Sequence, residues 1–365
     1  MNKENPFKFG TVVDGIYFTN RTKELSAIQQ SLNSQNHLIL IGPRRFGKTS
    51  LVKKVIKAEK RKSVFLDVQL TNSVEDFAAQ YLKRIYSIYP LGKIRNILKN
   101  FRIVPNINLN PVSNEVEIQF QANLDTRPIL EDVFNLLEKL SSQKNKPIVV
   151  LGEFQDIKRL DKGIDWILRS VMQNHQNINY IFLGSQESMM REIFEKKKSP
   201  FYHFAQLMYL KKIDRDHFTT FIEKGFAKVS VNSKEIAQQV LTFTEGHPFY
   251  TQQLSYLVWN FLNNKIKKEN IVEQAIVENI HIHDLDFERL WLTFNSTDKK
   301  TLTRLSTNNR SPLSAKSANK MNIKASSTVF SSLKRLMKSG YVIKTSGFYE
   351  IDDPFFREWI VLRRK

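Results

Sequence analysis

The feature that most constrains this chain is a short segment that reads Gly-Pro-Arg-Arg-Phe-Gly-Lys-Thr over residues 42–49. An apolar run at His37–Ile41 precedes it and is expected to form a buried strand, and a helical pattern follows at Ser50–Ala58. The two glycines let the backbone turn its amides inward around an anion, and the following helix directs its positive N-terminal end at the same point. This order of strand, loop and helix predicts a loop that binds phosphate groups.

The residue types in the loop indicate how a nucleotide is held. Lys48 is expected to reach the β- and γ-phosphates and to act in catalysis, and the hydroxyl of Thr49 is expected to ligate Mg²⁺. We therefore predict a site for ATP and Mg²⁺. The predicted nucleotide contacts of the loop are Gly42, Pro43, Arg44, Arg45, Phe46, Gly47, Lys48, Thr49 and Ser50.

Further apolar runs alternate with helical patterns along the first 210 residues. Because strands that alternate with helices are typical of a parallel sheet covered on both faces, we expect an α/β core over residues 1–210. Segment 90–127 departs from this pattern, because apolar and polar residues alternate in two stretches on either side of a turn. We expect a β-hairpin insertion there. The other predicted strands are residues 63–68, 146–154 and 178–185, and the predicted helices are residues 73–87, 128–141 and 161–174.

The remaining residues are expected to form two smaller domains. Residues 211–296 are mainly helical in pattern and are expected to form a lid. Residues 297–365 are expected to contain three short helices, one of them at residues 314–321, and a final hairpin that turns at Ser346-Gly347, with Gly340 ending the helix before it. Helix, turn, helix and hairpin is the plan of a winged-helix domain.

The helix at residues 324–339 is the candidate contact element of that domain. Small hydroxyls and basic groups on one face of a helix suit contacts with DNA grooves and phosphates, so Lys334, Arg335 and Lys338 are candidate nucleic-acid contacts. A winged helix that serves only for packing or for binding a protein is the alternative. The expected apolar face is Val329, Phe330, Leu333, Leu336 and Met337, and the expected outward face is Ser326, Ser327, Ser331, Lys334, Arg335 and Lys338.

The charge of the chain is unevenly distributed. Residues 298–365 carry 15 lysines and arginines against 5 acidic residues, a net charge of +10, which is half of the +20 of the whole chain. Such a concentration favours polyanionic partners, nucleic acid first. The absence of cysteine excludes disulfides and thiolate metal sites. No apolar stretch is long enough to cross a membrane and the N-terminus lacks a signal-peptide core, so a cytoplasmic location is expected.

An acidic site is expected where the predicted strand Ile148–Leu151 ends. In ATPases with a phosphate loop this strand usually ends in Asp-Glu, in which the Asp positions Mg²⁺ and the Glu polarises the attacking water. Here the pair is Gly152-Glu153. Glu153 is therefore the candidate catalytic base, and the missing carboxylate at Gly152 predicts weak hydrolysis. Two other carboxylates are candidates to assist in binding the metal. They are Asp67, at the end of a neighbouring strand, and Asp156.

Two further places carry polar residues of interest. Ser185 and Gln186 follow a predicted strand, where a polar side chain can sense hydrolysis or can simply end the strand. Gly246-His247-Pro248 is expected to form a rigid kink between helices. His281 and His283 lack further partners at ligand spacing, and we interpret them as loop histidines rather than metal ligands.

These segments together resemble the archaeal-type ATPase family of archaea and bacteria, within the broader AAA+/STAND group of P-loop NTPases. The resemblance extends over almost the full length of the chain. Its most specific elements are the phosphate loop with a double arginine and the Gly-His-Pro segment, in combination. The matching segments are residues 17–25, 42–50, 152–156, 182–185, 199–202, 246–248 and 349–356.

The resemblance implies an ATP-binding α/β core with a parallel sheet, a helical lid and a C-terminal winged helix. It implies that Phe18 and Arg21 lie near the adenine, together with Gly246, His247 and Pro248. Gly152 departs from the family pattern, which has Asp at this position. The family's biological role is poorly defined, so the resemblance identifies no client.

The combined expectation is a nucleotide-dependent switch with weak ATP hydrolysis, in which ATP closes the lid and repositions the winged helix. The alternative is a non-hydrolysing regulator whose nucleotide site is structural and whose output is DNA or protein binding. A small-molecule kinase is disfavoured, because a kinase needs neither a winged helix nor a Gly-x-Pro lid. A protein partner of unknown identity and an oligomeric assembly are both compatible with this expectation.

Overall fold

The computed structural model describes residues 4–34, 36–109, 116–121, 125–264, 270–307, 326–345 and 347–364. The chain divides into two compact units. One unit, which we call the sheet unit, consists of residues 22–42 and 51–210. The other, which we call the lid–wing unit, has its described residues within 1–21, 43–50 and 211–365. Each unit has its own hydrophobic core.

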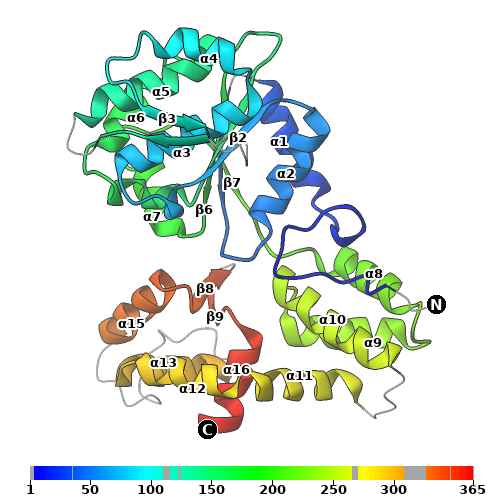
Figure 1. The fold of residues 1–365 in the computed structure, drawn as a ribbon. Coiled ribbons are helices and arrows are strands. Elements are labelled where there is room, and N and C mark those ends of the chain that lie inside the picture. The colour runs from blue at the N-terminus through cyan, green and yellow to red at the C-terminus, as the bar shows by residue number, and fades with distance from the viewer. Residues whose placement is uncertain are drawn as a thin grey trace. The chain divides into compact units, whose positions relative to one another are not determined.

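A five-stranded parallel sheet forms the centre of the sheet unit (Figure 1). The strand order is β2-β5-β6-β1-β7. Because every pair of neighbouring strands is parallel, all five carboxyl ends lie along one edge of the sheet. Four of these strands were predicted as apolar runs, and the fifth, β7, was not. The strands are β1 (His37–Ile41), β2 (Ser63–Asp67), β5 (Ile148–Gly152), β6 (Asn179–Gly184) and β7 (Ala205–Tyr209).

Helices cover both faces of this sheet, as the alternating pattern predicts (Figure 1). Helix α1 (Thr22–Asn33) and the part of α2 (Lys48–Glu59) in this unit lie on one face. The other face carries four helices whose apolar sides pack into one core with the strands. They are α3 (Val74–Ile88), α5 (Thr126–Leu140), α6 (Ile164–Met172) and α7 (Glu187–Phe194).

The segment between α3 and α5 contains a helix and a two-stranded antiparallel sheet. The strands β3 (Asn106–Leu109) and β4 (Val116–Gln119) correspond to the predicted hairpin, and its turn lies outside the described residues. Helix α4 (Leu91–Leu98) was not predicted. The described residues before position 160 also form short 3₁₀ helices, namely η1 (Gly15–Tyr17), η2 (Val68–Leu70) and η3 (Phe154–Arg159).

The lid is a group of helices joined by the N-terminal segment of the chain. Phe7 is 2% exposed and packs on Phe226 with ring centroids 4.9 Å apart. Gly225 makes this contact possible, because a Cβ there would lie 2.4 Å from Cζ of Phe7. The lid helices are α8 (Arg215–Phe226), α9 (Ser233–Thr244), α10 (Pro248–Asn263), α11 (Ile271–Ile282) and α12 (Asp284–Thr293).

The last part of the chain has helices around an antiparallel hairpin, and Gly347 lies in its turn with φ +89°. The predicted helix at residues 314–321 falls outside the described residues. A C-terminal helix, α16, follows the hairpin and was not predicted. The prediction that Phe330 belongs to the apolar face was wrong, because its side chain is 53% exposed. The elements are α13 (Ser296–Ser306), α15 (Ser326–Lys338), β8 (Val342–Thr345), β9 (Phe348–Ile351) and α16 (Pro354–Arg364).

Among the described residues, no helix is both long enough and apolar enough to cross a lipid bilayer.

Candidate nucleotide-binding site

The start of the phosphate loop is fixed by hydrogen bonds to neighbouring strands. The amide of Gly42 donates to the carbonyl of Gly184 at 3.2 Å, and the amide of Leu210 donates to the carbonyl of Ile41 at 2.7 Å. A Cβ at Gly42 would lie 3.0 Å from Cβ of Leu210, so a larger residue would push against the chain that follows β7. The loop therefore leaves β1 at the carboxyl edge of the sheet, beside the end of β6.

The loop itself has the backbone that its glycine spacing predicts. Gly47 has φ +86°, and Arg45 also has a left-handed φ of +63°. Helix α2 begins at Lys48, immediately after the loop. The ammonium group of Lys48 donates to the carbonyl of Pro43 at 3.0 Å, and the residue is only 7% exposed. Lys48 thus bends back over the loop, which is the position required to contact a phosphate held by the loop amides.

Several lid residues contact the loop within the lid–wing unit. The ring of Phe46 lies edge-on to the ring of His247 with centroids 4.8 Å apart. Arg21, which is 5% exposed, has Nη2 3.5 Å from the carbonyl of Phe46. The guanidinium of Arg45 donates to the hydroxyl of Tyr250 at 2.9 Å. Two groups that the family resemblance places near adenine, Arg21 and His247, therefore both lie beside the loop.

The other predicted nucleotide contacts differ from one another in how far they are buried. Arg44 is exposed, and Thr49 is partly buried in the first turn of α2. The hydroxyl of Ser50 accepts a hydrogen bond from the amide of Val13 at 3.1 Å, which anchors the N-terminal segment. Phe18 is partly buried and directly follows η1.

The Gly-His-Pro segment forms a sharp start to α10. Gly246 has φ +74°, and Pro248 occupies the first turn of the helix. Nδ1 of His247 accepts a hydrogen bond from the amide of Phe249 at 3.3 Å. The neutral imidazole therefore carries its proton on Nε2. That nitrogen lies 3.3 Å from Oδ1 of Asp352, although the two atoms do not have hydrogen-bond geometry.

Glu153 is held at the carboxyl edge of the sheet by three donors. It has a left-handed φ of +46°. Its Oε2 accepts from the side-chain amide of Gln155 at 2.6 Å and from the backbone amide of Ser185 at 3.2 Å. The hydroxyl of Ser185 donates to the same oxygen. The structure thus brings Glu153 and Ser185 together, and it adds Gln155, to which the sequence analysis gave no role.

Gly152 faces a carboxylate on the adjacent strand. It pairs with Asp67 in the register of β2 and β5. A Cβ at Gly152 would lie 3.7 Å from Cγ of Asp67, which is ordinary contact distance, so a side chain at this position has room. Oδ1 of Asp67 accepts a hydrogen bond from the amide of Gln69 at 3.0 Å. Asp156 lies in η3 and is partly buried.

These residues fit a magnesium–nucleotide complex in donor type. The loop supplies amides and the Lys48 ammonium for phosphates, and Thr49 supplies a hydroxyl at the start of α2. Within the described ranges, no group of three or more His, Asp or Glu side chains is arranged to hold a metal ion by itself. A bound Mg²⁺ would then depend on phosphate oxygens and Thr49.

The three basic residues on this face of α15, Lys334, Arg335 and Lys338, are all exposed. Arg335 also pairs with Asp298 of α13, with Nη2 at 2.6 Å from Oδ1 and Nε at 2.9 Å from Oδ2. The hydroxyl of Ser332 donates to the same carboxylate. Of the three predicted nucleic-acid contacts, Arg335 thus joins two helices of its own domain.

Comparison with known proteins agrees with this architecture. Residues 18–254 match the model of an ATPase domain predominantly from Archaea, and residues 285–362 match a probable winged helix domain. An uncharacterized protein of Methanocaldococcus jannaschii is 23% identical over 257 residues, which are 69% of this chain and 47% of that protein. The chain therefore spans about half the length of this curated relative.

Two solved structures are similar in fold. A Walker-type ATPase of Pyrococcus abyssi has a TM-score of 0.63 at 18% identity, with 94% of this chain and 96% of that chain covered. The ORC2 protein of Aeropyrum pernix, solved in complexes with ADPNP and ADP, has a TM-score of 0.56 at 14% identity, with 98% of each chain covered. The ATPase family model matches well over half of the chain and includes the phosphate loop and the sheet, and the second model matches the C-terminal domain. The chain belongs to the family of ATPase domains found predominantly in Archaea, and it carries a winged-helix domain after the ATPase domain.

Proposed function

We propose that this chain is an ATP-dependent switch that binds ATP with Mg²⁺ and hydrolyses it slowly. The observation that carries the proposal is the phosphate loop, in which Lys48 bends onto the carbonyl of Pro43 and α2 begins at the same residue. A phosphate oxygen is a stronger acceptor for an ammonium group than a backbone carbonyl. ATP would therefore draw Lys48 from Pro43 and bind across the loop amides.

The relatives support nucleotide binding at this site. The similar protein from Pyrococcus abyssi is a Walker-type ATPase, and the similar protein from Aeropyrum pernix was solved with ADPNP and ADP. Their identities of 18% and 14% support a common fold, so the transfer of nucleotide binding rests on the loop residues of this chain.

Slow hydrolysis follows from the surroundings of Glu153. A bound Mg²⁺ would supply charge neutralisation on the phosphates, and Glu153 would accept a proton from the attacking water. The three donors to Oε2 of Glu153 already occupy one of its two oxygens and must be displaced before that oxygen can accept a proton from water. Gly152 supplies no carboxylate to hold the metal. Both features favour long-lived ATP binding over rapid turnover.

The direct test is ATP affinity measured by calorimetry in the presence of Mg²⁺. Lys48→Ala should weaken binding roughly ten- to a hundredfold, because it removes a charge-assisted contact of about 1.5–3 kcal/mol. Lys57→Ala is the matched control, because Lys57 is an exposed lysine in the last turn of the same helix. Equal affinity in the wild type and the Lys48 variant would refute the assigned site.

A non-hydrolysing regulator is the alternative form of the same switch, and a turnover assay separates the two. In either form we propose that the winged helix is the output domain and that it binds nucleic acid through exposed lysines. The supporting observations are the net charge of +10 in residues 298–365 and the exposure of Lys334 and Lys338. A protein partner is the competing occupant of this surface, which the exposed side chain of Phe330 would suit.

A further inference from the structure

The middle of the phosphate loop is held by the lid. Residues 43–50 belong to the lid–wing unit, whereas β1 before them and most of α2 after them belong to the sheet unit. Two adjacent loop residues, Arg45 and Phe46, contact side chains at the start of α10. The conformation of the loop therefore depends on α10 as well as on the glycines of the loop.

Arg45 combines a costly backbone conformation with two side-chain contacts. Its φ of +63° lies in the left-handed region, which residues other than glycine adopt only at an energetic cost. Its guanidinium carbon lies 4.6 Å from the centroid of the Phe249 ring, and the guanidinium donates to the hydroxyl of Tyr250 at 2.9 Å. Because the backbone of Arg45 decides where its side chain points, these contacts favour the left-handed conformation and offset part of its cost.

The backbone conformation of Arg45 matters for phosphate binding. Left-handed residues in a loop turn successive backbone amides towards one point, which creates a binding site for an anion. Gly47, with φ +86°, adopts this conformation without steric cost because it has no Cβ. Arg45 lacks that freedom, so without its contacts to α10 the loop would more often leave the conformation that directs its amides inward.

Phe46 provides a second contact between the loop and α10. Its ring lies edge-on to the ring of His247, and both residues are only 2% exposed, so this contact is shielded from water. Two neighbouring loop residues are thus fastened to neighbouring residues at the start of one helix, which restricts both the position and the direction of the loop.

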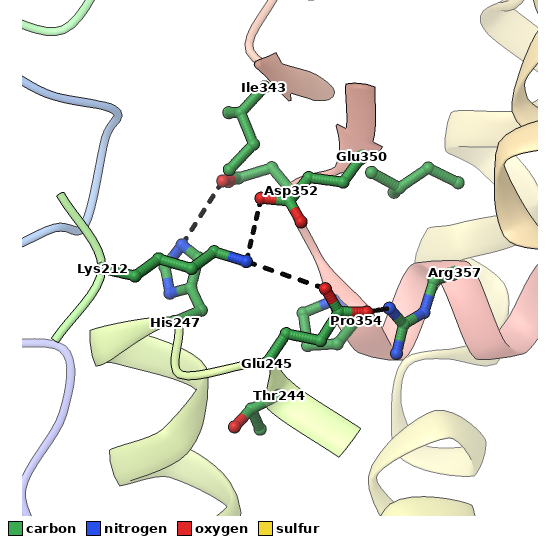
Figure 2. Close-up of a pocket in the computed structure, with 10 residues that line it drawn as sticks. Lys212, Thr244, Glu245, His247, Ile343, Glu350, Asp352, Pro354 and Arg357 are labelled. Carbon is green, nitrogen blue, oxygen red and sulfur yellow. Dashed lines mark hydrogen bonds and ion pairs between the residues drawn. The ribbon is translucent and has the colours of Figure 1, made fainter. Parts of the chain in front are cut away.

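The start of α10 is itself anchored by ion pairs with the winged-helix domain (Figure 2). Glu245, immediately before the Gly-His-Pro segment, lies 2.5 Å from Arg357 of α16 and 3.9 Å from Lys212. Lys212 also lies 2.9 Å from Glu350 of β9. The four side chains are between 13% and 21% exposed, so these pairs are less screened by water than pairs on an open surface. Helix α10 therefore presents Phe249 and Tyr250 to the loop from a fixed base.

We propose that Arg45 is a positioning residue, which Phe249 and Tyr250 hold so that the phosphate loop keeps its nucleotide-binding conformation before ATP arrives. This inference rests on the proposed binding of ATP at the loop. Arg45 then contributes to ATP affinity through its backbone, and its guanidinium stays on α10 when ATP binds. A loop that is ordered beforehand loses less conformational entropy on binding, which raises affinity.

Calorimetry of ATP binding to the full chain with Mg²⁺ tests this role. Arg45→Ala loses the contacts with α10 and keeps the cost of the left-handed conformation, so it should weaken ATP binding roughly three- to tenfold. Arg45→Gly loses the same side chain but adopts that conformation freely, so its affinity should be within about twofold of the wild type.

The contact with α10 is tested by a double-mutant cycle. Tyr250→Phe keeps the ring and removes the acceptor for Arg45, so it should weaken ATP binding about two- to fivefold. In the Arg45→Gly background the same change should have no effect on ATP affinity, because the contact is already gone. Tyr256→Phe, on the same helix, keeps the ring that packs on Phe9 and should bind ATP as the wild type does. Thermal unfolding of each variant establishes that it is folded.

Failure of the proposed function and failure of the positioning role give different results. If the wild type does not bind ATP, or binds it no better than Lys48→Ala, the nucleotide site itself is wrong. If the site is sound but Arg45→Gly is as weak as Arg45→Ala, or Tyr250→Phe binds ATP as tightly as the wild type or more tightly, the positioning role is overturned. An equal effect of Tyr250→Phe in both backgrounds would overturn it as well, since Tyr250 would then act without Arg45.

Discussion

Gly152 and Glu153 are adjacent residues with opposite effects on the proposed chemistry. Glu153 supplies a carboxylate at the edge of the sheet, and Gly152 leaves a position beside Asp67 without one. The end of β5 could be predicted from the apolar run that precedes it. The contact of Glu153 with Ser185 could not, because it requires that β5 and β6 be neighbours, and the order of strands in the chain does not specify their order in the sheet.

Substitutions at this pair should change ATP turnover in opposite directions. Glu153→Gln removes the proposed base and should lower turnover at least about a hundredfold. Gly152→Asp should raise Mg²⁺-dependent turnover severalfold, because a Cβ fits there and the carboxylate can position the metal. Gly152→Asn is the control of equal size without charge. If a folded Gly152→Asp variant is no faster than Gly152→Asn in a phosphate-release assay, a missing carboxylate is not the cause of slow hydrolysis.

Two buried histidines predict how stability depends on pH. Burial lowers the pKa of both His37 and His175 to about 4, with smaller contributions from their charged neighbours. An unfolded histidine has a pKa of about 6.5, so the unfolded state binds more protons between these values. The stabilisation is present above about pH 6.5 and is lost as the pH falls towards 4, by as much as about 3 kcal/mol for each residue.

Urea denaturation at pH 7.5 and pH 5 measures this effect. His175→Gln should reduce the difference in unfolding free energy between the two pH values, since one of the two titrating groups is gone. His281→Gln, at an exposed position, should leave the difference unchanged. If the His175 variant shows the same difference in unfolding free energy as the wild type, other groups cause the sensitivity to acid.

At the scale of elements, three of the four predicted strands of the parallel sheet are buried along their whole length. All residues of β1, β5 and β6 are buried, so each appears in the sequence as a continuous apolar run. Strand β7 lies at the edge of the sheet and is mostly half-buried, so its residues give no such run. Helix α16 was missed although Asp353 and Pro354 form a recognisable helix start, because the hairpin was expected to be the last element of this domain.

The contact between α8 and the N-terminal segment gives a prediction at this scale. Gly225→Ala should lower the unfolding free energy by about 1–3 kcal/mol, because the new methyl group would lie 2.4 Å from Cζ of Phe7. In a Phe7→Ala background the same change should instead stabilise by up to about 1 kcal/mol, since alanine is the better helix former.

Gly92 provides the matched control. It lies in α4, and a methyl group at this position would meet no neighbouring side chain within 4 Å, so Gly92→Ala should not destabilise the chain. Denaturation curves of the single and double variants measure these changes in unfolding free energy. A Gly225 effect that is the same in both backgrounds would show that Phe7 is not responsible.

At the scale of the whole molecule, charge rather than packing sets the expectations for partners. The +10 of residues 298–365 was evident from composition, but the pairing of Arg335 with Asp298 was not, because it depends on how α13 meets α15. The structure therefore assigns different roles to neighbouring cations on one helix. Lys334 and Lys338 remain available to a polyanion, and Arg335 holds two helices together.

Salt dependence of DNA binding should reveal this difference. Binding through phosphate contacts is driven by counterion release, so Lys334→Ala with Lys338→Ala should lower the log–log salt slope by about two units. Arg335→Ala should mainly lower thermal stability and should change the slope less. Fluorescence anisotropy with a labelled duplex at several salt concentrations measures the slopes. No binding at low salt, or equal slopes in wild type and double variant, would identify the winged helix as a protein-binding or packing domain.

The attachment of the N-terminal segment to the lid has a consequence for synthesis of the chain. Asn5 bonds to the carbonyl of Tyr256 and the side chain of Asn260, which are separated from it by 251 and 255 residues. At typical rates of translation, roughly 10–50 s pass between the synthesis of the N-terminal segment and the synthesis of these partners. His247 and Tyr250, which contact the phosphate loop, emerge equally late. The sheet can therefore form on the ribosome before the N-terminal segment and the phosphate loop acquire their contacts with the lid helices.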